Sequence, residues 1–339
     1  MATQLEGSFA SIRSGALVLL LGIAVYAIVS ALFIDAEDVA QLNRISPTYL
    51  VLAVLLALTP WLINSLRLLI WLRFIGVRSR LWDAAQVVLG SAVGAAVSPS
   101  AVGGAPVKAA LLARLGVSMG HSVTLTSLGS LEDALVAVVA LPVALLAVPW
   151  LRVLPLEGIL NAWPWGVAFL AALVLSAVIF QRLRRALGMH AFWMRLERWL
   201  AELRELYASI IRQGKGRLLL NVVLSCIQWM ARYSVITALA WGMGLEVDPV
   251  LFGLLQWLCF VAMALVPTPG AVGGAEAAFL LVYRDLIPAE MIVLLMGAWR
   301  VLSFYFLNMT ALAILAVLRA PAGWRSMRRL AQAGRVGST

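Results

Sequence analysis

Six apolar segments, each long enough to cross a bilayer, constrain this chain more than any other feature. About 20 predominantly apolar residues span the hydrocarbon core as a helix. The segments of this length are 15–34, 48–75, 121–149, 162–181, 217–242 and 288–318. Of the 339 residues, 63% are hydrophobic and only 12% are charged, unlike a water-soluble domain. The sequence therefore predicts an all-α polytopic membrane protein, with about six full transmembrane helices.

The basic residues give these segments a direction. The formal net charge is +10, and Lys and Arg gather after the second segment, in 182–217 and in the tail 319–339. By contrast, 35–44 and 243–249 are acidic. Cytoplasmic loops carry the excess of Lys and Arg, so we expect both termini in the cytoplasm. Some attraction to anionic lipid is also expected.

Two further apolar stretches, 84–115 and 249–284, are broken in the middle by proline and glycine. The charge pattern requires each to return to the face from which it entered. Each arm has about 15 residues, roughly 22 Å of helix, which reaches the middle of the bilayer without crossing it. We therefore predict two re-entrant helical hairpins, whose irregular tips must be buried in protein or line a cavity.

The two broken stretches resemble each other. AVGGA occurs at 101–105 and again at 271–275, with Pro99 matching Pro269 and Arg114 matching Arg284. At a second common offset, Arg67 and Asp83 match Arg232 and Asp248. These matches predict a single transmembrane domain over 1–339, built as an inverted repeat with halves of about 48–149 and 217–318. Transporters built this way carry the substrate site at the repeat interface.

Ionisable side chains within the apolar segments are costly in lipid and mark candidate site residues. They are Arg67, Lys108, Glu132, Asp133, Arg232, Glu276 and Arg300. One reading is mutual neutralisation, in which Glu132 or Asp133 pairs with Arg300 and Glu276 pairs with Arg232 or Arg67. The other reading is a hydrated cavity that accepts a charged headgroup. The two are compatible, because an ion pair can open to receive a ligand.

The glycines of the hairpin tips offer a second kind of site. We expect helices to begin near Gly103–Gly104 and Gly273–Gly274, with free backbone N–H groups that favour an anion. Tight packing of small residues against neighbouring helices is the alternative role for these glycines. The candidate substrate-binding set also includes three tip prolines: Pro99, Pro267 and Pro269.

Outside the spans, 190–212 has apolar residues at helical period and charges on the opposite face. We interpret 182–216 as a cytoplasmic segment containing an amphipathic helix, with a structural role.

The sequence lacks the residues that several classes of function require. Cys226 and Cys259 lie in apolar runs, and His121 and His190 are isolated, so no metal site or disulfide framework is expected. The phosphate-binding motif of nucleotide-driven pumps is absent. We expect no catalytic residues, no cofactor and no nucleic-acid partner. The expected partners are membrane lipids, with lipid-biosynthesis enzymes as a second class, and a homo-oligomer is compatible with the sequence.

The stretches SPSAVGGAPVKAALLARLG and PTPGAVGGAEAAF resemble signatures of the lysylphosphatidylglycerol synthase transmembrane, or flippase-like, family. This family includes the membrane half of the bacterial multiple peptide resistance factor. The resemblance covers roughly 10–320 and implies movement of lipids between leaflets of the bacterial cytoplasmic membrane. It assigns Pro267, Pro269, Gly273, Gly274 and Glu276 to one hairpin. To the other it assigns Pro99, Gly103, Gly104, Pro106 and Lys108, followed by Glu132 and Asp133.

The chain departs from that family in two respects. It contains no soluble aminoacyl-transferase domain, so we do not expect it to synthesise lysyl-lipid. It carries Ala105-Pro106 where relatives often have a Gly-Glu type of pair. Phospholipids, aminoacylated phospholipids, hopanoids and polyprenyl-linked lipids therefore all remain candidate cargoes. The alternatives to a lipid flippase are a non-catalytic membrane subunit of a lipid-synthesis complex and a membrane-embedded transferase acting on a lipid-linked substrate. A secondary transporter of a small solute is a further alternative.

Overall fold

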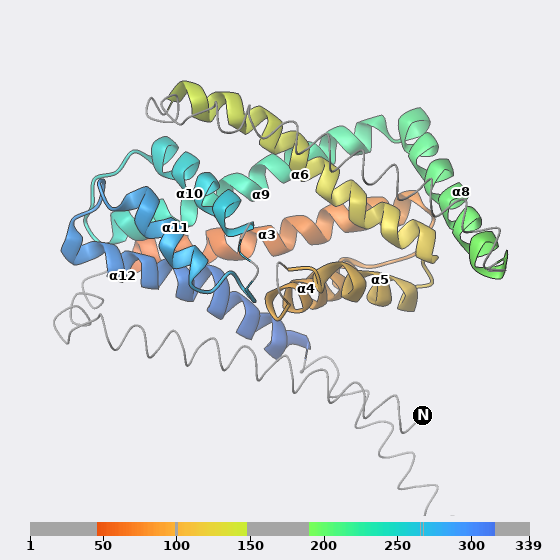
Figure 1. Cartoon of the computed structure of the whole chain (residues 1–339), viewed down its shortest axis with the longest axis horizontal. Helices are drawn as coiled ribbons and strands as arrows, with labels where there is room; N and C mark the ends of the chain where they lie inside the picture. Colours follow the sequence, from red (N-terminus) through yellow and green to blue (C-terminus); the bar gives the residue numbers. More distant parts are fainter. Residues whose placement is uncertain (1–45, 99–100, 148–189, 265, 267, 316–339) are drawn as a thin grey trace, which may run out of the picture. The chain divides into compact units, whose positions relative to one another are not determined.

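The computed structural model describes residues 46–98, 101–147, 190–264, 266 and 268–315, and every element in this part of the chain is helical (Figure 1). The helices are α3 (Pro47–Phe74), α4 (Leu81–Ala96), α5 (Gly104–Arg114), α6 (Met119–Ala147), α8 (His190–Gln213), α9 (Lys215–Gly242), α10 (Pro249–Ala264), α11 (Gly274–Tyr283), α12 (Ala289–Arg300) and the π-helix η2 (Val301–Phe306). The predicted spans 15–34 and 162–181, the tail 319–339, Pro99 and Pro267 lie outside the described residues.

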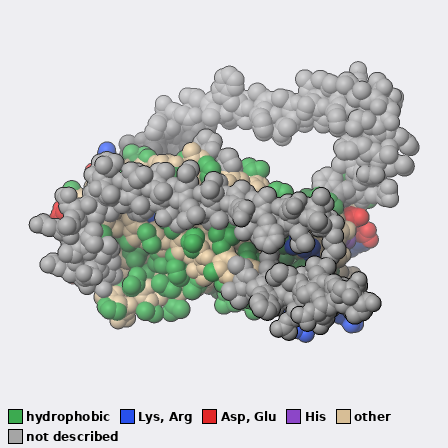
Figure 2. All heavy atoms as spheres, turned by 90° about the horizontal axis from the view of Figure 1, so that it is seen from below, with side chains coloured by type: hydrophobic (Ala, Val, Ile, Leu, Met, Phe, Trp, Pro, Cys, Tyr) green, Lys and Arg blue, Asp and Glu red, His purple; other side chains and the backbone are tan. Residues whose placement is uncertain are grey.

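Three of the described helices are long and apolar enough to cross a membrane: Pro47–Phe74, Lys215–Gly242 and Ala289–Leu315. The third joins α12 and η2 into one continuous helix. Large hydrophobic side chains such as Leu55, Met230 and Leu281 are exposed. In Figure 2 hydrophobic side chains cover much of the visible described surface. Such a surface is suited to contact with lipid.

Contacts between residues separate the described part of the chain into two compact units. One is formed by the described residues up to 117 and from 223 onward, and the other by those between 118 and 222. In the first unit α3 and α9 lie antiparallel. The backbone N–H of Ser46 donates to the carbonyl of Gly242 at 2.9 Å. Further along the pair, the guanidinium of Arg67 donates to Gln228 Oε1 at 3.0 Å. The start of α3 therefore lies beside the end of α9.

α4 and α5 form the first hairpin, in which small residues allow the backbones to approach closely. A side chain on Gly94 would come within 2.7 Å of Val107 and 3.0 Å of the carbonyl oxygen of Gly103. Ser91 Oγ donates to the carbonyl of Gly104 at 3.0 Å, bridging the arms. Close packing of small residues is a common means of joining helices in membranes, and here it explains the glycines.

α10 and α11 form the second hairpin. The Tyr283 hydroxyl donates to the carbonyl of Phe252 at 2.9 Å, and Gly274 packs against Val266 near the tip. The predicted breaks are confirmed, because α5 begins at Gly104 and α11 begins at Gly274.

The two sets of helices correspond element by element. α3 and α9 each have 28 residues, and α4 and α10 each have 16. Within the tips, Ala101 and Ala271 are the two described non-glycine residues with positive φ, at 57° and 53°. This conformation is rare for alanine, and its occurrence in both copies of AVGGA supports a common origin.

The register of the repeat differs from the prediction outside the hairpin tips. Placing the first residues of α3 and α9 opposite each other sets Arg67 opposite Val235. The same alignment sets Arg80 opposite Asp248, at the residues that precede α4 and α10. The expected matches of Arg67 with Arg232 and of Asp83 with Asp248 are therefore wrong, because pairs of like residues were aligned instead of helix boundaries.

The second unit contains the amphipathic helix predicted over 190–212, which is confirmed as helix α8. Leu206 and Ile210 on α8 are buried. The hydroxyls of Ser127 on α6 and Tyr207 on α8 lie 2.9 Å apart. Ser118, just before α6, donates to Glu202 Oε2 at 2.6 Å. α8 is therefore fastened to α6 by polar contacts.

We expect substitution of Gly94 by alanine to destabilise the first hairpin, because the added methyl group collides with Val107 and with backbone. Overpacking of this kind costs about 1–3 kcal/mol. Gly253 on α10 is a matched control, since a side chain there meets nothing within 4 Å. Thermal unfolding of the purified protein in detergent would show a lower midpoint temperature for Gly94→Ala than for wild type. Gly253→Ala should unfold at the wild-type midpoint temperature. Equal midpoints for the two variants would contradict the close packing.

Candidate functional site

A cavity of about 540 Å³ lies between the tips of the two hairpins, within the first compact unit. The first hairpin contributes Ala92, Ala95, Ala96 and Ala101, and the second contributes Phe260, Met263, Val266, Thr268, Gly270 and Ala271. The remaining wall consists of Trp61 from α3, Trp229 and Arg232 from α9, and Ser303, Phe304, Leu307 and Asn308 from the helix that contains η2. The two copies of the broken tip therefore line one cavity, whose wall is mostly apolar with a few polar side chains.

Among the described residues that line this cavity, one has an ionisable side chain, Arg232. It is half-buried, and its guanidinium carbon lies 4.9 Å from the ring centre of Phe260 and 5.5 Å from that of Trp229. Aromatic faces attract a cation and hold it in place. The indole N–H of Trp229 is buried without a hydrogen-bond partner in the described part of the chain. α9 thus places a cationic side chain, held between aromatic rings, in the cavity wall.

Three other lining side chains carry oxygens that can accept hydrogen bonds. Thr268 Oγ1 donates to the carbonyl of Val272 at 2.9 Å, and Ser303 Oγ donates to that of Trp299 at 2.6 Å. Asn308 Nδ2 donates to the carbonyl of Phe304 at 2.8 Å. Because these contacts use donors, the oxygens of the three side chains retain lone pairs to accept hydrogen bonds. The wall therefore combines a cation with acceptor oxygens.

Behind the cavity wall, Arg300 and Glu276 form a buried ion pair. Arg300 Nε lies 2.7 Å from Glu276 Oε1, and the Arg300 side chain is 1% exposed. Arg300 also donates to the carbonyl of Gly270 at 3.1 Å, while Glu276 Oε2 accepts the N–H of Gly273 at 2.7 Å. Gly270 itself lines the cavity. The pair therefore fixes the tip of the second hairpin to α12 and shapes the cavity wall.

The π-helix η2 begins directly after Arg300 and carries Ser303 and Phe304 to the cavity. The ring of Phe304 packs against Gly270, and its centre lies 4.9 Å from the guanidinium carbon of Arg300. A π-helical turn within an α-helix is rare and often occurs at functional sites. Here it brings an aromatic ring over both the ion pair and the hairpin tip.

The ion pair differs from the combinations expected from the sequence. We expected Glu276 to pair with Arg232 or Arg67, but it pairs with Arg300. The buried Arg67, 3% exposed, donates to Gln228 and Asn64 instead and does not line the cavity.

The tip N–H groups are also arranged differently from the prediction. Gly103 donates to Ser98 Oγ at 2.7 Å, Gly104 donates to the carbonyl of Ala101 at 3.2 Å, and Gly273 donates to Glu276. The expectation that these groups are free for an anion is wrong at these three positions. Nearby side chains and turns satisfy them, as apolar surroundings require. The cationic side chain among the described residues of the cavity wall is Arg232.

The remaining described residues predicted to bind substrate do not line the cavity. Lys108 is half-buried on α5, and Pro269 is half-buried in the second hairpin tip. Glu132 is fully buried and Asp133 half-buried on α6, in the second compact unit. Sequence reasoning did not select Trp229, Phe260, Ser303, Phe304 or Asn308 as site residues. The spacing of Trp229 and Arg232, one turn apart on a helix, could have indicated that pair.

The described residues contain no cluster of three or more His, Cys, Asp or Glu side chains that could hold a metal ion.

Comparison with known proteins places this chain among membrane proteins. The family profile of the lysylphosphatidylglycerol synthase TM region matches residues 19–311. A curated relative, the UPF0104 membrane protein of Archaeoglobus fulgidus, is 22% identical over 310 residues. That match covers 85% of this chain and 92% of the relative.

We expect Glu276→Gln and Arg300→Gln each to destabilise the protein strongly, because either change leaves the remaining charge buried without its partner. Breaking a buried pair costs about 3–5 kcal/mol. The double variant should lose less than the sum of the two single losses. Equilibrium unfolding in mixed micelles would measure all three.

Arg284→Gln is the matched control, since Arg284 and its neighbour Asp285 are 66% and 85% exposed. A surface pair of this kind contributes little. Additive losses for Glu276→Gln and Arg300→Gln, or a loss as large for Arg284→Gln, would contradict the role of the buried pair.

Proposed function

Because the chain belongs to the family of the lysylphosphatidylglycerol synthase transmembrane region, we propose that it moves a polar-headgroup lipid between the leaflets of the cell membrane. The headgroup passes through the cavity between the two hairpin tips, while the acyl chains stay in the bilayer. The observation that carries this proposal is the joint lining of one cavity by both tips and by Arg232.

The chemistry of the cavity supports a phosphate-bearing headgroup. Arg232 suits the phosphate, because the N–H groups of a guanidinium match its oxygens. The acceptor oxygens of Ser303, Thr268 and Asn308 suit hydroxyl or ammonium groups on the same headgroup. A volume of about 540 Å³ lies within the range of small-molecule sites.

The geometry of the helices supports re-entrant hairpins in an inverted repeat. The arms have 16, 11, 16 and 10 residues. Even the longest is about 24 Å of helix, shorter than the hydrocarbon core of about 30 Å. The antiparallel packing of α3 and α9 supports opposite directions for the two halves. We infer that the hairpins enter from opposite faces, in a single transmembrane domain with six full spans and cytoplasmic termini.

The composition of the cavity wall favours transport over a membrane-embedded transferase. Acid–base catalysis needs a titratable group that can exchange a proton near neutral pH. Arg232 is the ionisable side chain among the described lining residues, and a guanidinium keeps its proton. A wall of this kind binds and releases a headgroup without changing it.

The proposed topology predicts which turns share a face of the membrane. With Cys226 and Cys259 first replaced by alanine, single cysteines at Arg78 and Gly116 should react with an impermeant maleimide from one side. Single cysteines at Glu246 and Asp285 should react from the other side. Sealed vesicles of known orientation provide the measurement. Labelling of Arg78 and Gly116 positions from different sides would contradict a re-entrant first hairpin.

The proposed route predicts the effects of two cavity variants on lipid exchange. We expect Arg232→Gln to slow transbilayer movement of a fluorescent anionic phospholipid by about tenfold, a loss of about 1.4 kcal/mol of transition-state stabilisation. Ala92→Trp should block movement by filling the cavity. Fluorescence quenching in proteoliposomes by an impermeant reductant gives the rate.

Two matched controls test whether these effects are specific. Arg284→Gln removes an exposed arginine, and Ala110→Trp adds the same ring at an exposed position of α5 outside the cavity. Both should exchange lipid at the wild-type rate. The proposal fails if wild-type protein accelerates no lipid across several headgroup classes, or if the control variants are as slow as the cavity variants.

A further inference from the structure

The turns that follow α3 and α9 share one backbone conformation. Gly76 and Gly244 have φ values of 80° and 81°. Val77 N–H donates to the carbonyl of Leu72 at 2.9 Å, and Leu245 N–H donates to that of Ala240 at 3.0 Å. This is the pattern of a helix ending in a left-handed glycine. The repeat has therefore conserved the shape of the turn in both halves.

The side chains on these two turns have opposite charges. With Gly76 opposite Gly244, the arginines at 73, 78 and 80 stand opposite Trp241, Glu246 and Asp248. Because α3 and α9 are antiparallel, the two turns lie at opposite ends of the helix pair. One end of this pair is basic and the other is acidic and aromatic.

The α3–α4 turn encloses a hollow of about 450 Å³. It is lined by Arg73, Gly76, Val77, Arg78, Ser79, Arg80 and Asp83. The three arginines are exposed, and none forms an ion pair with another residue that the structure describes. The Asp83 carboxylate accepts the backbone N–H of Arg80 at 2.8 Å, at the start of α4. The lining of the hollow thus includes three arginines and one carboxylate that already has a structural role.

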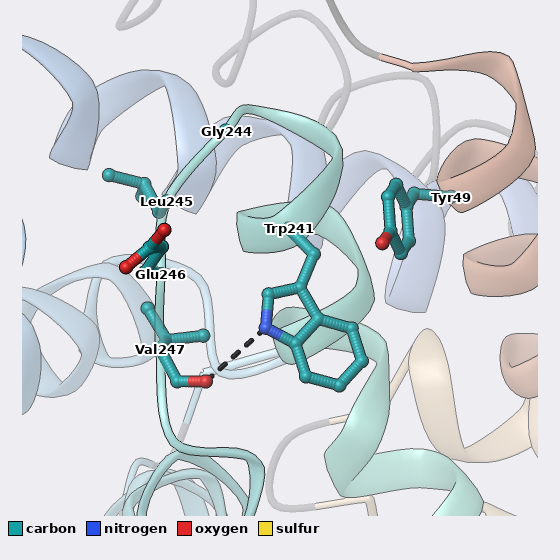
Figure 3. A pocket seen from close by; sticks show the side chains of 6 residues that line it. All are labelled: Tyr49, Trp241, Gly244, Leu245, Glu246 and Val247. Atoms are coloured by element: carbon teal, nitrogen blue, oxygen red, sulfur yellow. Dashed lines mark hydrogen bonds between the residues drawn. The ribbon is translucent and has the colours of Figure 1, made fainter.

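The α9–α10 turn forms the corresponding hollow at the other end (Figure 3). Its lining includes Tyr49, Trp241 and Glu246. The indole N–H of Trp241 donates to the carbonyl of Val247 at 3.2 Å, which fixes the ring against the turn. Asp248 Oδ1 accepts the N–H of Val250 at 2.7 Å and that of Leu251 at 3.0 Å, at the start of α10. No cationic side chain lines this hollow among the described residues.

The apolar neighbours of the basic turn indicate where an anion would come from. Leu81 and Trp82 directly follow Arg80 and are 37% and 46% exposed. Tryptophan is enriched at the level of the lipid headgroups. A guanidinium cluster beside such a residue meets lipid phosphates rather than free ions, and arginine binds phosphate through paired hydrogen bonds.

We propose that the α3–α4 turn is a docking site for the phosphate of anionic phospholipids, separate from the cavity between the hairpin tips. The α9–α10 turn, with the same backbone and opposite charge, does not bind them. This site would bind lipid whether or not the chain moves lipid across the membrane. Its binding therefore does not depend on the proposed function.

Native mass spectrometry of the full-length protein in detergent, titrated with phosphatidylglycerol, tests the proposal. The triple variant R73Q, R78Q and R80Q should bind the tightest lipid about tenfold more weakly or worse, since each basic residue near a membrane contributes about fivefold. The matched variant E246Q, in the equivalent turn, should bind like wild type. An unchanged triple variant, or an equal loss in E246Q, would overturn the proposal.

Two further measurements distinguish lipid docking from a folding defect and from the binding of free phosphate. The triple variant R73K, R78K and R80K keeps the charge but loses the paired hydrogen bonds of the guanidinium, so it should bind more weakly than wild type and more tightly than the glutamine variant, an order that a folding defect at these positions would not produce. Phosphatidylcholine should bind this site at least tenfold more weakly than phosphatidylglycerol. Equal binding of the two lipids, displacement of phosphatidylglycerol by millimolar inorganic phosphate, or a lysine variant as weak as the glutamine variant would overturn the assignment.

Discussion

A guanidinium enclosed by apolar side chains organises the second half of this protein. Arg300 is almost fully buried, so its charge must be compensated within the protein. Glu276 supplies the counter-charge, and the carbonyl of Gly270 accepts a further hydrogen bond. Glu276 in turn holds the N–H of Gly273. Through this network a single side chain joins a long helix to the tip of a hairpin and sets the position of a cavity wall.

The two hairpin tips satisfy their backbone N–H groups with different side chains. Each hairpin contains an irregular tip whose backbone polar groups need partners outside a regular helix. Both contain an alanine with positive φ, Ala101 in one and Ala271 in the other. In the first tip a neutral hydroxyl, Ser98 Oγ, accepts the glycine N–H, whereas in the second a carboxylate accepts it. The shared backbone and the diverged polar groups produce a cavity that is uncharged on one side and backed by an ion pair on the other.

The sequence predicted the features that depend on local composition. The apolar segments predicted helices at α3, α6, α9 and α12, and the glycines near 103 and 273 correctly located the tips, because helix breakers act within a few residues. The pairing of Glu276 with Arg300 could not be read from the chain, since it depends on how two helices pack. The position of Phe304 depends on the π-helix η2. The pattern of apolar residues in the sequence does not distinguish a π-helical turn from the α-helix around it. The expected match of Arg67 with Arg232 paired two residues of the same type. In the structure the ends of α3 and α9 correspond instead, and this places Arg67 opposite Val235.

The short arms of the hairpins have a consequence for how the chain is made. α5 has 11 residues and α11 has 10, too few for either to partition into lipid as an independent segment during synthesis. In the proposed re-entrant topology, each would therefore enter the membrane together with the preceding arm. In the first pair Gly94 lets the two backbones approach closely, so that the arms pack tightly against each other. Close packing at a glycine thus lets two arms, each too short to span the hydrocarbon core, form one compact unit.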